Sequence, residues 1–495
     1  MSLEDIRNVR IKKSELLKES GINPYPILSE IDHTIEETVE KFDDLLSKKK
    51  PITIGGRVMS LRPQGGLIFF NVYDGTAKFQ GLIKKDIIKD ESFDLFLNTV
   101  DIGDFVEISG SVFLTKRNEK TLEVIGWKML SKSLRPLPEK WHGLQDVEER
   151  FRHRYLDILM NEEIKKRFIL RSKIISEIRS FLEKSGYVEV ETPMLQYLAG
   201  GASALPFKTH HNALDADIYL RIAPELCLKK LLIAGFPKVF EIGRNFRNEG
   251  IDVTHNPEFT MLEFYESFSS ASKQMAFTEK LIKALVKKIP EEIVSTGGEK
   301  IEFSKKFNVV SYFDVLRRYA LISNPENIGL DDLKLKAQQF GVKVDEGDTV
   351  AKILDNIFKK ICRPKLIQPT FIVKYPAEYL PLAKRDEKDP KIVDAFQLII
   401  NGIELLKAFS ELNDPIDQQE RFKIQDKNKE AGDKEAQSSD EEFIEALEYG
   451  MPPAGGVGIG IDRLVMFLTN TKNIREVILF PTLKPKKETD KKEEI

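Results

Sequence analysis

Cysteine is scarce in this sequence, which limits the kinds of domain it can form. The 495 residues include two cysteines, Cys227 and Cys362, which lie far apart and outside any C-x-x-C or Cys/His cluster. A disulfide scaffold and a zinc ribbon are therefore excluded. The segment G-x-x-x-x-G-K-S/T is also absent, which excludes a P-loop nucleotidase.

Long apolar runs and a strong net charge are missing as well. No stretch approaches about 18 uninterrupted apolar residues, and residues 1–13 are charged and lack the apolar core of a signal peptide. Basic and acidic residues number 76 and 79, a formal net charge of −3, so any surface that binds nucleic acid must be local. We expect a soluble cytoplasmic protein that does not enter a membrane.

Changes of pattern along the chain predict several domains, roughly two or three for this length. Residues 1–50 are interpreted as an N-terminal helical appendix. Five β-rich runs within 51–133 predict a small barrel of the OB-fold type, which can present aromatic side chains to single-stranded nucleic acid. The proline-containing stretch 134–150 predicts a linker to a large domain, 151–484, with a mainly helical insertion at about 268–365. The polar tail, 485–495, is expected to be disordered.

Residues 238–266 predict an antiparallel hairpin made of a strand, a polar loop and a second strand. An isolated arginine–glutamate pair on facing strands is usually a surface pair worth about 0 to 1 kcal/mol. Here, however, polar groups are dense within an otherwise apolar hairpin. The strand period of two brings them to one face: Glu241, Gly243, Asn245 and Arg247 from the first strand, and Phe259, Met261, Glu263 and Tyr265 from the second. Such a face suits a ligand that combines a triphosphate, a flat base and a cation.

Three segments of the large domain resemble the motifs of a known enzyme family. FRNEG with THNPEFTMLEFY, in the hairpin, resembles motif 2 of the class II aminoacyl-tRNA synthetases in its lysine-specific form. The helix followed by VEVETP resembles motif 1, and GGVGIGIDRLVMFLT, residues 455–469, resembles motif 3. The resemblance spans nearly the whole chain. It implies an α+β protein, with an N-terminal OB-fold β-barrel that binds the anticodon and a catalytic domain built on an antiparallel sheet flanked by helices.

The same resemblance implies a reaction and the residues that carry it. The reaction is ATP-dependent activation of L-lysine to lysyl-adenylate, with Mg²⁺, and transfer of the lysyl group to the 3′ end of tRNA(Lys). Motif 1 implies a homodimer. The implied catalytic residues are Arg247 and Arg463. The residues implied to bind ATP are Arg247, Asn248, Glu249, His255, Asn256, Phe259, Gly460 and Arg463. Those implied to bind lysine are Gly201, Glu225, Arg247, Glu263, Tyr265, Lys407, Phe409 and Glu411.

The carboxylates implied for lysine also make chemical sense. Glu225 would receive the α-amino group, and Glu263 and Glu411 the ε-ammonium. A neutral substrate would leave these acids unpaired, at a cost of roughly several kcal/mol. Glu411 by itself, inside SELNDP, is as readily interpreted as a residue that initiates a turn.

Two positions depart from the family pattern in AFQLIINGIELLKAFSELNDP. Glu404 is retained as a metal ligand, but Gln397 replaces a second acid and Lys407 replaces an asparagine, so each change adds one positive charge. We hypothesise that Lys407 partly replaces a divalent ion, which would make the enzyme tolerant of low Mg²⁺. Strict alternation puts Glu404 on the opposite side from Lys407 and Glu411, so a shared site requires a bulge or twist in this strand.

In the predicted barrel, Phe69 and Gln80 match family positions that stack on an anticodon uridine and hydrogen-bond to it. Phe69 is followed by Phe70, and such a pair usually contributes one side chain to the core and one to the surface. An acidic anticodon contact is expected nearby, from either Glu119 or Glu123.

Several rival interpretations remain. KMLSKS, residues 128–133, imitates the lysine loop of class I synthetases, but it has an extra residue, follows a predicted barrel strand and has no accompanying H-I-G-H segment. Aspartyl- or asparaginyl-tRNA synthetases share the motifs, although Glu263 and Glu411 disfavour an acidic substrate. A lysyltransferase that modifies a translation factor lacks the barrel. A non-catalytic nucleic-acid-binding descendant is disfavoured because Arg247 and Arg463 are retained.

Overall fold

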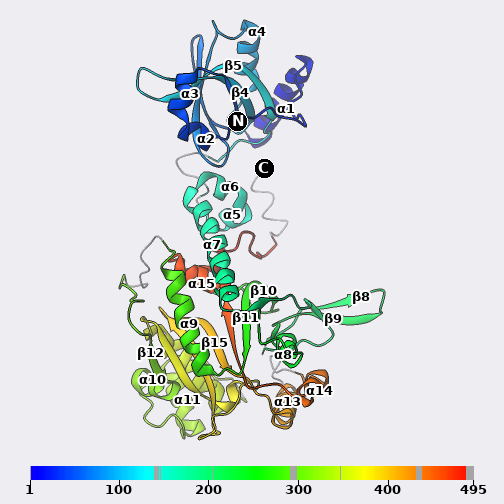
Figure 1. The fold of residues 1–495 in the computed structure, drawn as a ribbon, viewed down its shortest axis with the longest axis vertical. Coiled ribbons are helices and arrows are strands. Elements are labelled where there is room, and N and C mark those ends of the chain that lie inside the picture. Colours follow the sequence, from blue (N-terminus) through cyan, green and yellow to red (C-terminus); the bar gives the residue numbers. More distant parts are fainter. Residues whose placement is uncertain are drawn as a thin grey trace. The chain divides into compact units, whose positions relative to one another are not determined.

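The computed structural model describes residues 2–138, 144, 146–202, 204–289, 298–345, 347–430 and 438–485. The chain divides into two compact units, Met1–Gln145 with Lys484–Ile495, and Asp146–Leu483 (Figure 1). Residues 139–143 and 145 of the predicted linker, and the predicted tail beyond Pro485, lie outside the described residues. Within the described ranges, no helix is long and apolar enough to cross a membrane.

In the first unit five strands close into a barrel, in the order β1–β2–β3–β5–β4. The strands are β1 (Ile52–Gln64), β2 (Leu67–Tyr73), β3 (Lys78–Lys84), β4 (Phe105–Leu114) and β5 (Lys120–Ser131). Only β3 and β5 pair in parallel. Alternate residues face inward, as Ile68, Phe70 and Val72 of β2 do, because side chains of a strand point to opposite faces in turn. The predicted OB-fold type of barrel is confirmed.

Four helices accompany the barrel: α1 (Leu3–Glu19), α2 (Ile35–Glu40), α3 (Phe42–Lys48) and α4 (Asp90–Thr99). A capping box between Ser2 and Asp5 starts α1, which satisfies free backbone N–H groups at its first turn. From α4, Phe96 is fully buried and meets the ring of Trp127 edge-on, with centroids 5.0 Å apart. The barrel core therefore extends onto α4.

A buried ion cluster lies beside the end of β5. Lys132, the lysine of the KMLSKS segment, has a fully buried side chain, and its Nζ lies 2.6 Å from Asp101 Oδ2 and 2.7 Å from Asp104 Oδ2. Lys13 of α1 also pairs with Asp101, at 2.7 Å. Burial raises the pKa of Asp104 even though Lys132 opposes the shift. Lys132 thus has a structural role in the barrel unit, in keeping with the rejection of a class I lysine loop.

Replacing Lys132 by methionine should destabilise the barrel, because two largely buried carboxylates would lose their shared cation. We expect the free energy of unfolding of the full chain's barrel transition to fall by roughly 3 kcal/mol, measured by urea denaturation followed by circular dichroism. Lys48→Met is the matched control, since Lys48 is exposed and pairs with exposed Asp44. Equal midpoints for the two variants would contradict a structural role for Lys132.

The second unit is built on an eight-stranded sheet in the order β12–β13–β14–β15–β16–β11–β10–β6. Its strands are β6 (Val188–Glu189), β10 (Lys238–Phe246), β11 (Glu258–Ser267), β12 (Asn308–Ser311), β13 (Thr370–Pro376), β14 (Ile392–Ile400), β15 (Ile403–Ser410) and β16 (Ala454–Gly460). The central strands are antiparallel, and parallel pairs occur only at the two edges, β12 with β13 and β10 with β6. This agrees with the predicted antiparallel sheet.

Long helices cover one face of this sheet, and on the other face Ile372, Ala395 and Ile399 of β13 and β14 pack into a second core cluster. Leu262, Phe264, Val457, Ile459 and Ala408 point from adjacent strands into the largest core cluster, which also includes residues of the long helices α7 (Glu162–Lys184), α9 (Ala271–Val286) and α15 (Ile461–Leu468). In Figure 1, α9 lies across the strands near β15. The alternating residues of the same strands point to the opposite face.

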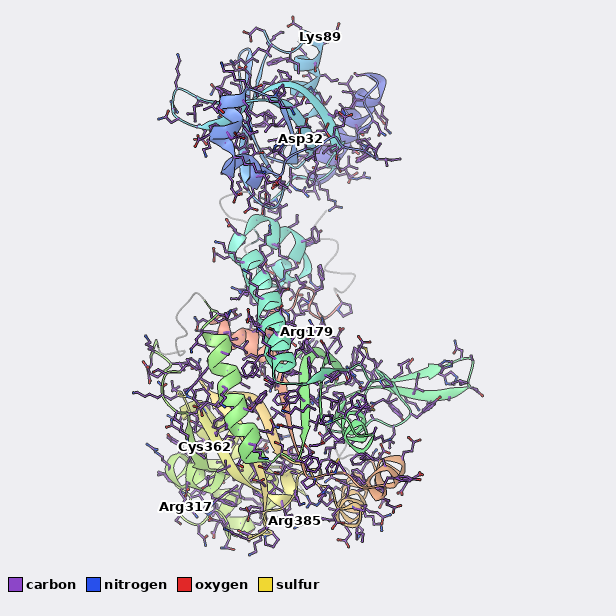
Figure 2. The ribbon with its side chains drawn as sticks, in the orientation of Figure 1. Asp32, Lys89, Arg179, Arg317, Cys362 and Arg385 are labelled. Atoms are coloured by element: carbon purple, nitrogen blue, oxygen red, sulfur yellow. The ribbon has the colours of Figure 1, made fainter. Side chains whose placement is uncertain are left out.

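The remaining elements surround the sheet. They are α5 (Val147–Arg152), α6 (Arg154–Met160), α8 (Glu225–Ile233), α10 (Tyr312–Ala320), α11 (Leu330–Gln339), α12 (Val350–Ile357), η1 (Phe358–Cys362), η2 (Arg363–Lys365), η3 (Ala377–Tyr379), α13 (Pro415–Glu430), α14 (Glu441–Glu448), η4 (Ile474–Glu476), and a three-stranded sheet of β7 (Leu195–Gln196), β9 (Ala216–Leu220) and β8 (Lys208–His211). Cys227 and Cys362 are both free thiols, and Cys362, which is labelled in Figure 2, is buried at the end of η1.

Candidate active site

The hairpin of β10 and β11 has the register that the sequence predicts. Its cross-strand partners include Glu241 with Glu263, Gly243 with Met261, and Asn245 with Phe259. Arg247 continues the pairing, since its N–H donates to the carbonyl oxygen of Pro257 at 2.8 Å. Directly opposed residues share a face of the sheet, so the predicted polar and aromatic face exists.

Strand β16 adds glycines to the same face. Gly456 lies opposite Tyr265, Gly458 opposite Glu263, and Gly460 opposite Met261. A Cβ at Gly456 would overlap Glu411 Oε1 and the Tyr265 ring, and one at Gly458 would lie 2.6 Å from Met261 Cε. These two glycines are therefore required, because the side chains of Glu411, Tyr265 and Met261 approach the backbone of β16 closely.

A bulge in β15 brings Glu404 to this face. Gln397 pairs with Lys407 and Leu398 with Leu406, but Ile399 pairs with Glu404, so one residue of β15 is extra. Since Ile399 and Gln397 face the same way, Glu404 shares their side with Lys407. The bulge that a shared site requires is present.

Three carboxylates and a tyrosine gather beside the glycines. Glu225 at the start of α8, Glu263 of β11 and Glu411 after β15 are all buried. Tyr265 donates its hydroxyl proton to Glu263 Oε2 at 2.8 Å. Gly201 completes this wall: its φ is +86°, and a Cβ there would lie 3.1 Å from Glu225 Cβ. The implied lysine-binding acids thus gather in one buried cluster, which we call the acidic pocket.

Burial controls the ionisation of these groups. It raises the pKa of Glu263 to about 8, and nearby Glu225 adds to the shift. It raises the pKa of Glu411 to about 8 as well, although Lys229 opposes this. Burial also raises the pKa of Tyr265, so that its hydroxyl remains a proton donor. Without a cationic ligand, the pocket therefore retains protons at neutral pH.

The arginines lie at the other end of the face. The guanidinium of Arg247 stands 5.1 Å above the ring of Phe259, and its buried Nε has no hydrogen-bond partner among the described residues. Burial lowers the pKa of Arg247, while Glu249 opposes that shift. An uncommitted guanidinium N–H on this face is available to an anionic ligand.

Arg463 is tied to the loop of the hairpin. It is the third residue of α15, and its Nη2 donates to His255 Nε2 at 2.7 Å. His255 Nδ1 lies 2.8 Å from Asp252 Oδ2, so the tautomer protonated at Nδ1 satisfies both contacts. The implied phosphate-binding His255 is thus also a brace between Asp252 and Arg463.

Asn256 has a supporting position in the same loop. Its buried amide donates to the Glu258 carbonyl at 2.6 Å and accepts from the Thr482 N–H at 3.3 Å. Asn248 is exposed, and its backbone N–H donates to the Leu205 carbonyl at 2.7 Å. Of the implied ATP residues in this loop, Asn256 is thus committed to the chain's own backbone.

Two family models match most of the chain. The model for class II tRNA synthetases of the aspartate, lysine and asparagine group matches residues 146–484, and that for OB-fold nucleic-acid-binding domains matches residues 52–130. A lysine–tRNA ligase of Pelotomaculum thermopropionicum is 47% identical over 98% of this chain and 96% of its own length. The chain belongs to the class II lysine–tRNA ligases.

Other lysine–tRNA ligases are similarly close. That of Aquifex aeolicus is 49% identical over 88% of this chain and 74% of its own length, and that of Syntrophomonas wolfei is 46% identical over 98% of each. Among the rivals raised by the motifs, the aspartyl and asparaginyl enzymes share the family model but are not supported by these full-length matches.

The region that the family resemblance implies for metal binding is poor in acids. Among the described residues, no three His, Cys, Asp or Glu side chains form a group able to hold a metal ion. Glu404 is accompanied on its face by Gln397 and Lys407. The Gln397 Oε1 accepts from the Tyr375 hydroxyl at 2.8 Å. In the part of the chain that the structure describes, Lys407 has no ion-pair partner.

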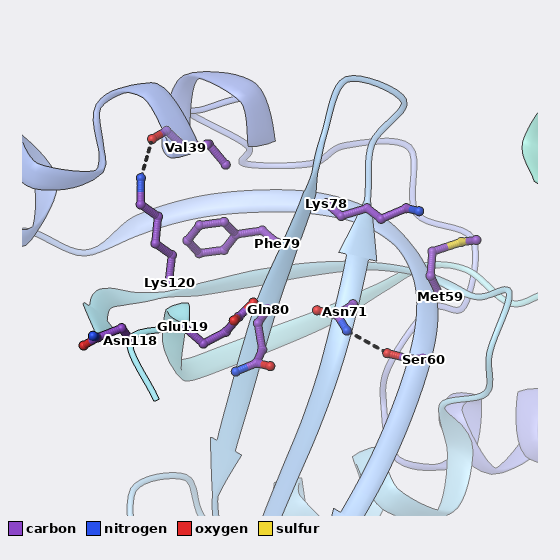
Figure 3. Close-up of a pocket in the computed structure, with 10 residues that line it drawn as sticks. All are labelled: Val39, Met59, Ser60, Asn71, Lys78, Phe79, Gln80, Asn118, Glu119 and Lys120. Carbon is purple, nitrogen blue, oxygen red and sulfur yellow. Dashed lines mark hydrogen bonds between the residues drawn. The ribbon is translucent and has the colours of Figure 1, made fainter. Parts of the chain in front are cut away.

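The barrel of this ligase carries a pocket of about 420 Å³ on its strands β1, β2 and β3 (Figure 3). Gln80 lines it and donates to Thr121 Oγ1 at 2.9 Å. Glu119 lines the same pocket, whereas Glu123 pairs with Lys84 at 2.5 Å. Phe69 is half-buried on the outer side of β2 and does not line the pocket, while its neighbour Phe70 is in the core.

Residues that the motifs did not identify hold the site together. Arg171 of α7 pairs with Asp462 at 2.7 Å, and Asp462 also accepts the Thr260 N–H at 2.7 Å, which ties α15 to β11. Lys229 is buried between Glu225 and Glu411. Its spacing of four residues from Glu225 was the available signal, but the partner Glu411 is 182 positions away in the sequence.

Lysine should bind more tightly as the pH rises from about 6 to about 8, because Glu263 and Glu411 must lose protons to receive an ammonium. Affinity should rise by up to about tenfold per pH unit for each proton released. Isothermal titration calorimetry in buffers of different ionisation enthalpy would measure both the affinity and the proton count. Because folding raises these carboxyl pKa values, the free energy of unfolding of the lysine-free protein should also fall as the pH rises over this range. An affinity that stays constant across it would contradict protonation of the pocket.

Proposed function

We propose that the glycine-floored face of β11, β15 and β16 catalyses lysyl-adenylate formation, and that the product is transferred to tRNA(Lys). The observation that carries this assignment is the convergence of three buried carboxylates with the uncommitted Arg247 on one face. The acids suit a dication such as lysine, and the arginine suits a phosphate or a carboxylate.

The chemistry requires no covalent enzyme intermediate. The lysine carboxylate oxygen attacks the α-phosphorus of ATP, the bond from this phosphorus to the bridging oxygen breaks, and pyrophosphate leaves. Arg247 would neutralise charge on the α-phosphate as it develops, with Phe259 stacked on adenine and Arg463 beside the other phosphates. A ribose hydroxyl at the tRNA 3′ end then attacks the carbonyl carbon, and AMP leaves.

One Mg²⁺ fits the donor set, since this ion is commonly held by one or two carboxylates together with substrate phosphates. Glu404 would hold it with the ATP phosphates, where it would neutralise phosphate charge. Gln397 is a weaker candidate ligand because its carbonyl oxygen already accepts a hydrogen bond from Tyr375. The ammonium of Lys407 on the same face would pair with a phosphate or with the lysine carboxylate.

We assign anticodon recognition to the barrel pocket. Gln80 and Glu119 present hydrogen-bonding groups there, and Lys78 and Lys120 at its rim supply positive charge for phosphates. Glu119 is preferred to Glu123, whose carboxylate is paired with Lys84. Phe69, outside the pocket, would stack on a base at its margin. A homodimer formed through motif 1 is part of the same proposal.

ATP–pyrophosphate exchange without tRNA, run against each of the twenty amino acids, tests the assignment. We expect exchange with lysine alone, and a loss of roughly 100-fold or more in Arg247→Met, because one charge-stabilising group is removed from the transition state. Exchange with a different amino acid would mean that Gln397 and Lys407 have altered the pocket. No exchange at all would favour a nucleic-acid-binding protein.

Lys407→Asn tests the role of the extra cation. The variant should need several-fold more Mg²⁺ for half-maximal adenylate formation, because a local positive charge has been removed from the phosphate region. ATP binding at limiting Mg²⁺, measured by calorimetry, should weaken in parallel. Identical magnesium dependence of the two enzymes would refute the hypothesis.

A further inference from the structure

Lys229 places a permanent cation inside the acidic pocket. Its side chain has no exposed area, and its Nζ lies 2.6 Å from Glu225 Oε1 and 2.5 Å from Glu411 Oε2. The rings of Phe409 and Phe443 stand 5.5 and 5.9 Å from the same nitrogen. This ammonium is therefore enclosed by two acids and two aromatic rings, and none of the catalytic steps above uses it.

The position of Lys229 connects two parts of the fold that supply acids. Glu225 and Lys229 are four residues apart on α8 and so share one side of the helix. Glu411 belongs to the segment that leaves β15, where its N–H donates to the Ala454 carbonyl at 2.9 Å. Lys229 thus fixes the distance between a carboxylate of the helix and a carboxylate of the sheet.

The charges of the pocket give a reason for a fixed cation. Three ionised carboxylates would bring three negative charges, whereas lysine brings two ammonium groups. The ammonium of Lys229 is a third positive charge, so positive and negative charges become equal in number when lysine is bound. Burial favours a neutral amine, but Glu225 and Glu411 outweigh it and raise the pKa of Lys229, so this side chain stays charged. Arg247 remains for the substrate carboxylate.

We infer that Lys229 is a positioning and specificity-determining residue, which holds Glu225 and Glu411 ready for the two ammonium groups of lysine and matches the pocket's charge to theirs. The inference rests on the proposed function. Without Lys229, the acids facing one another, Glu225, Glu263 and Glu411, would repel, and the empty pocket would take up an additional proton. Lysine would have to displace that proton at neutral pH.

The test compares Lys229→Met with the wild-type enzyme and with Lys230→Met, a neighbour on α8 that faces Glu442 at 3.7 Å, outside the pocket. Lysine binding is followed by calorimetry in two buffers of different ionisation enthalpy, and pyrophosphate exchange gives the KM values for lysine and ATP. In Lys229→Met we expect about one more proton released per lysine bound near pH 7, and a KM for lysine raised about tenfold or more. The KM for ATP should change little, and the lysine defect should shrink toward pH 9. Lys230→Met should match the wild type.

An unchanged proton count and an unchanged KM for lysine in a folded Lys229→Met enzyme would overturn the inference. If Lys229→Met does not fold, the double variant Lys229→Met/Glu225→Gln decides, because it removes one acid together with the cation. A folded double variant would support charge matching, and an unfolded one would overturn it in favour of a packing role. Failure of the wild type to exchange pyrophosphate with lysine would instead refute the proposed function.

Discussion

The desolvation of three carboxylates in one pocket is the constraint on which the second unit depends. Glu225, Glu263 and Glu411 are buried. Removing an ionised carboxylate from water costs roughly several kcal/mol unless the carboxylate is paired. The protein meets this cost in two ways, with the internal ammonium of Lys229 and with protons retained through raised carboxyl pKa values. A cationic substrate can replace the retained protons, because its ammonium groups would then neutralise the ionised acids.

Two glycines of β16 allow the side chains of this pocket to lie close to the sheet. Gly456 and Gly458 stand between β11 and β15, where any Cβ would meet Tyr265, Glu411 or Met261. On the opposite face the same strand contributes Val457 and Ile459 to the main core. A single strand therefore contributes apolar side chains to the core on one side and lets polar side chains approach its backbone on the other.

A buried lysine between two acids has a structural role in the first unit and a proposed role in substrate binding in the second. Lys132 and Lys229 are both fully buried lysines held between two acids. In the Lys132 cluster, both acids are paired: Asp101 with Lys132 and Lys13, and Asp104 with Lys132. At Lys229, Glu263 and one oxygen of Glu411 are left without a cation. Acidic groups without a paired cation are therefore the feature that distinguishes the proposed binding pocket from the structural ion cluster.

The sequence by itself determined the local features: the five-stranded barrel, the antiparallel hairpin and the common face of Glu263, Tyr265 and Arg247. These follow from strand alternation and from motifs in which the residues are close together along the chain. Tertiary structure alone decided the bulge that brings Glu404 beside Lys407, the presence of Glu119 rather than Glu123 in the lining of the barrel pocket, and the pairing of Lys229 with Glu411. Each of these depends on register or on contact between segments distant in sequence, and such contacts are fixed by packing of the whole sheet rather than by local preference.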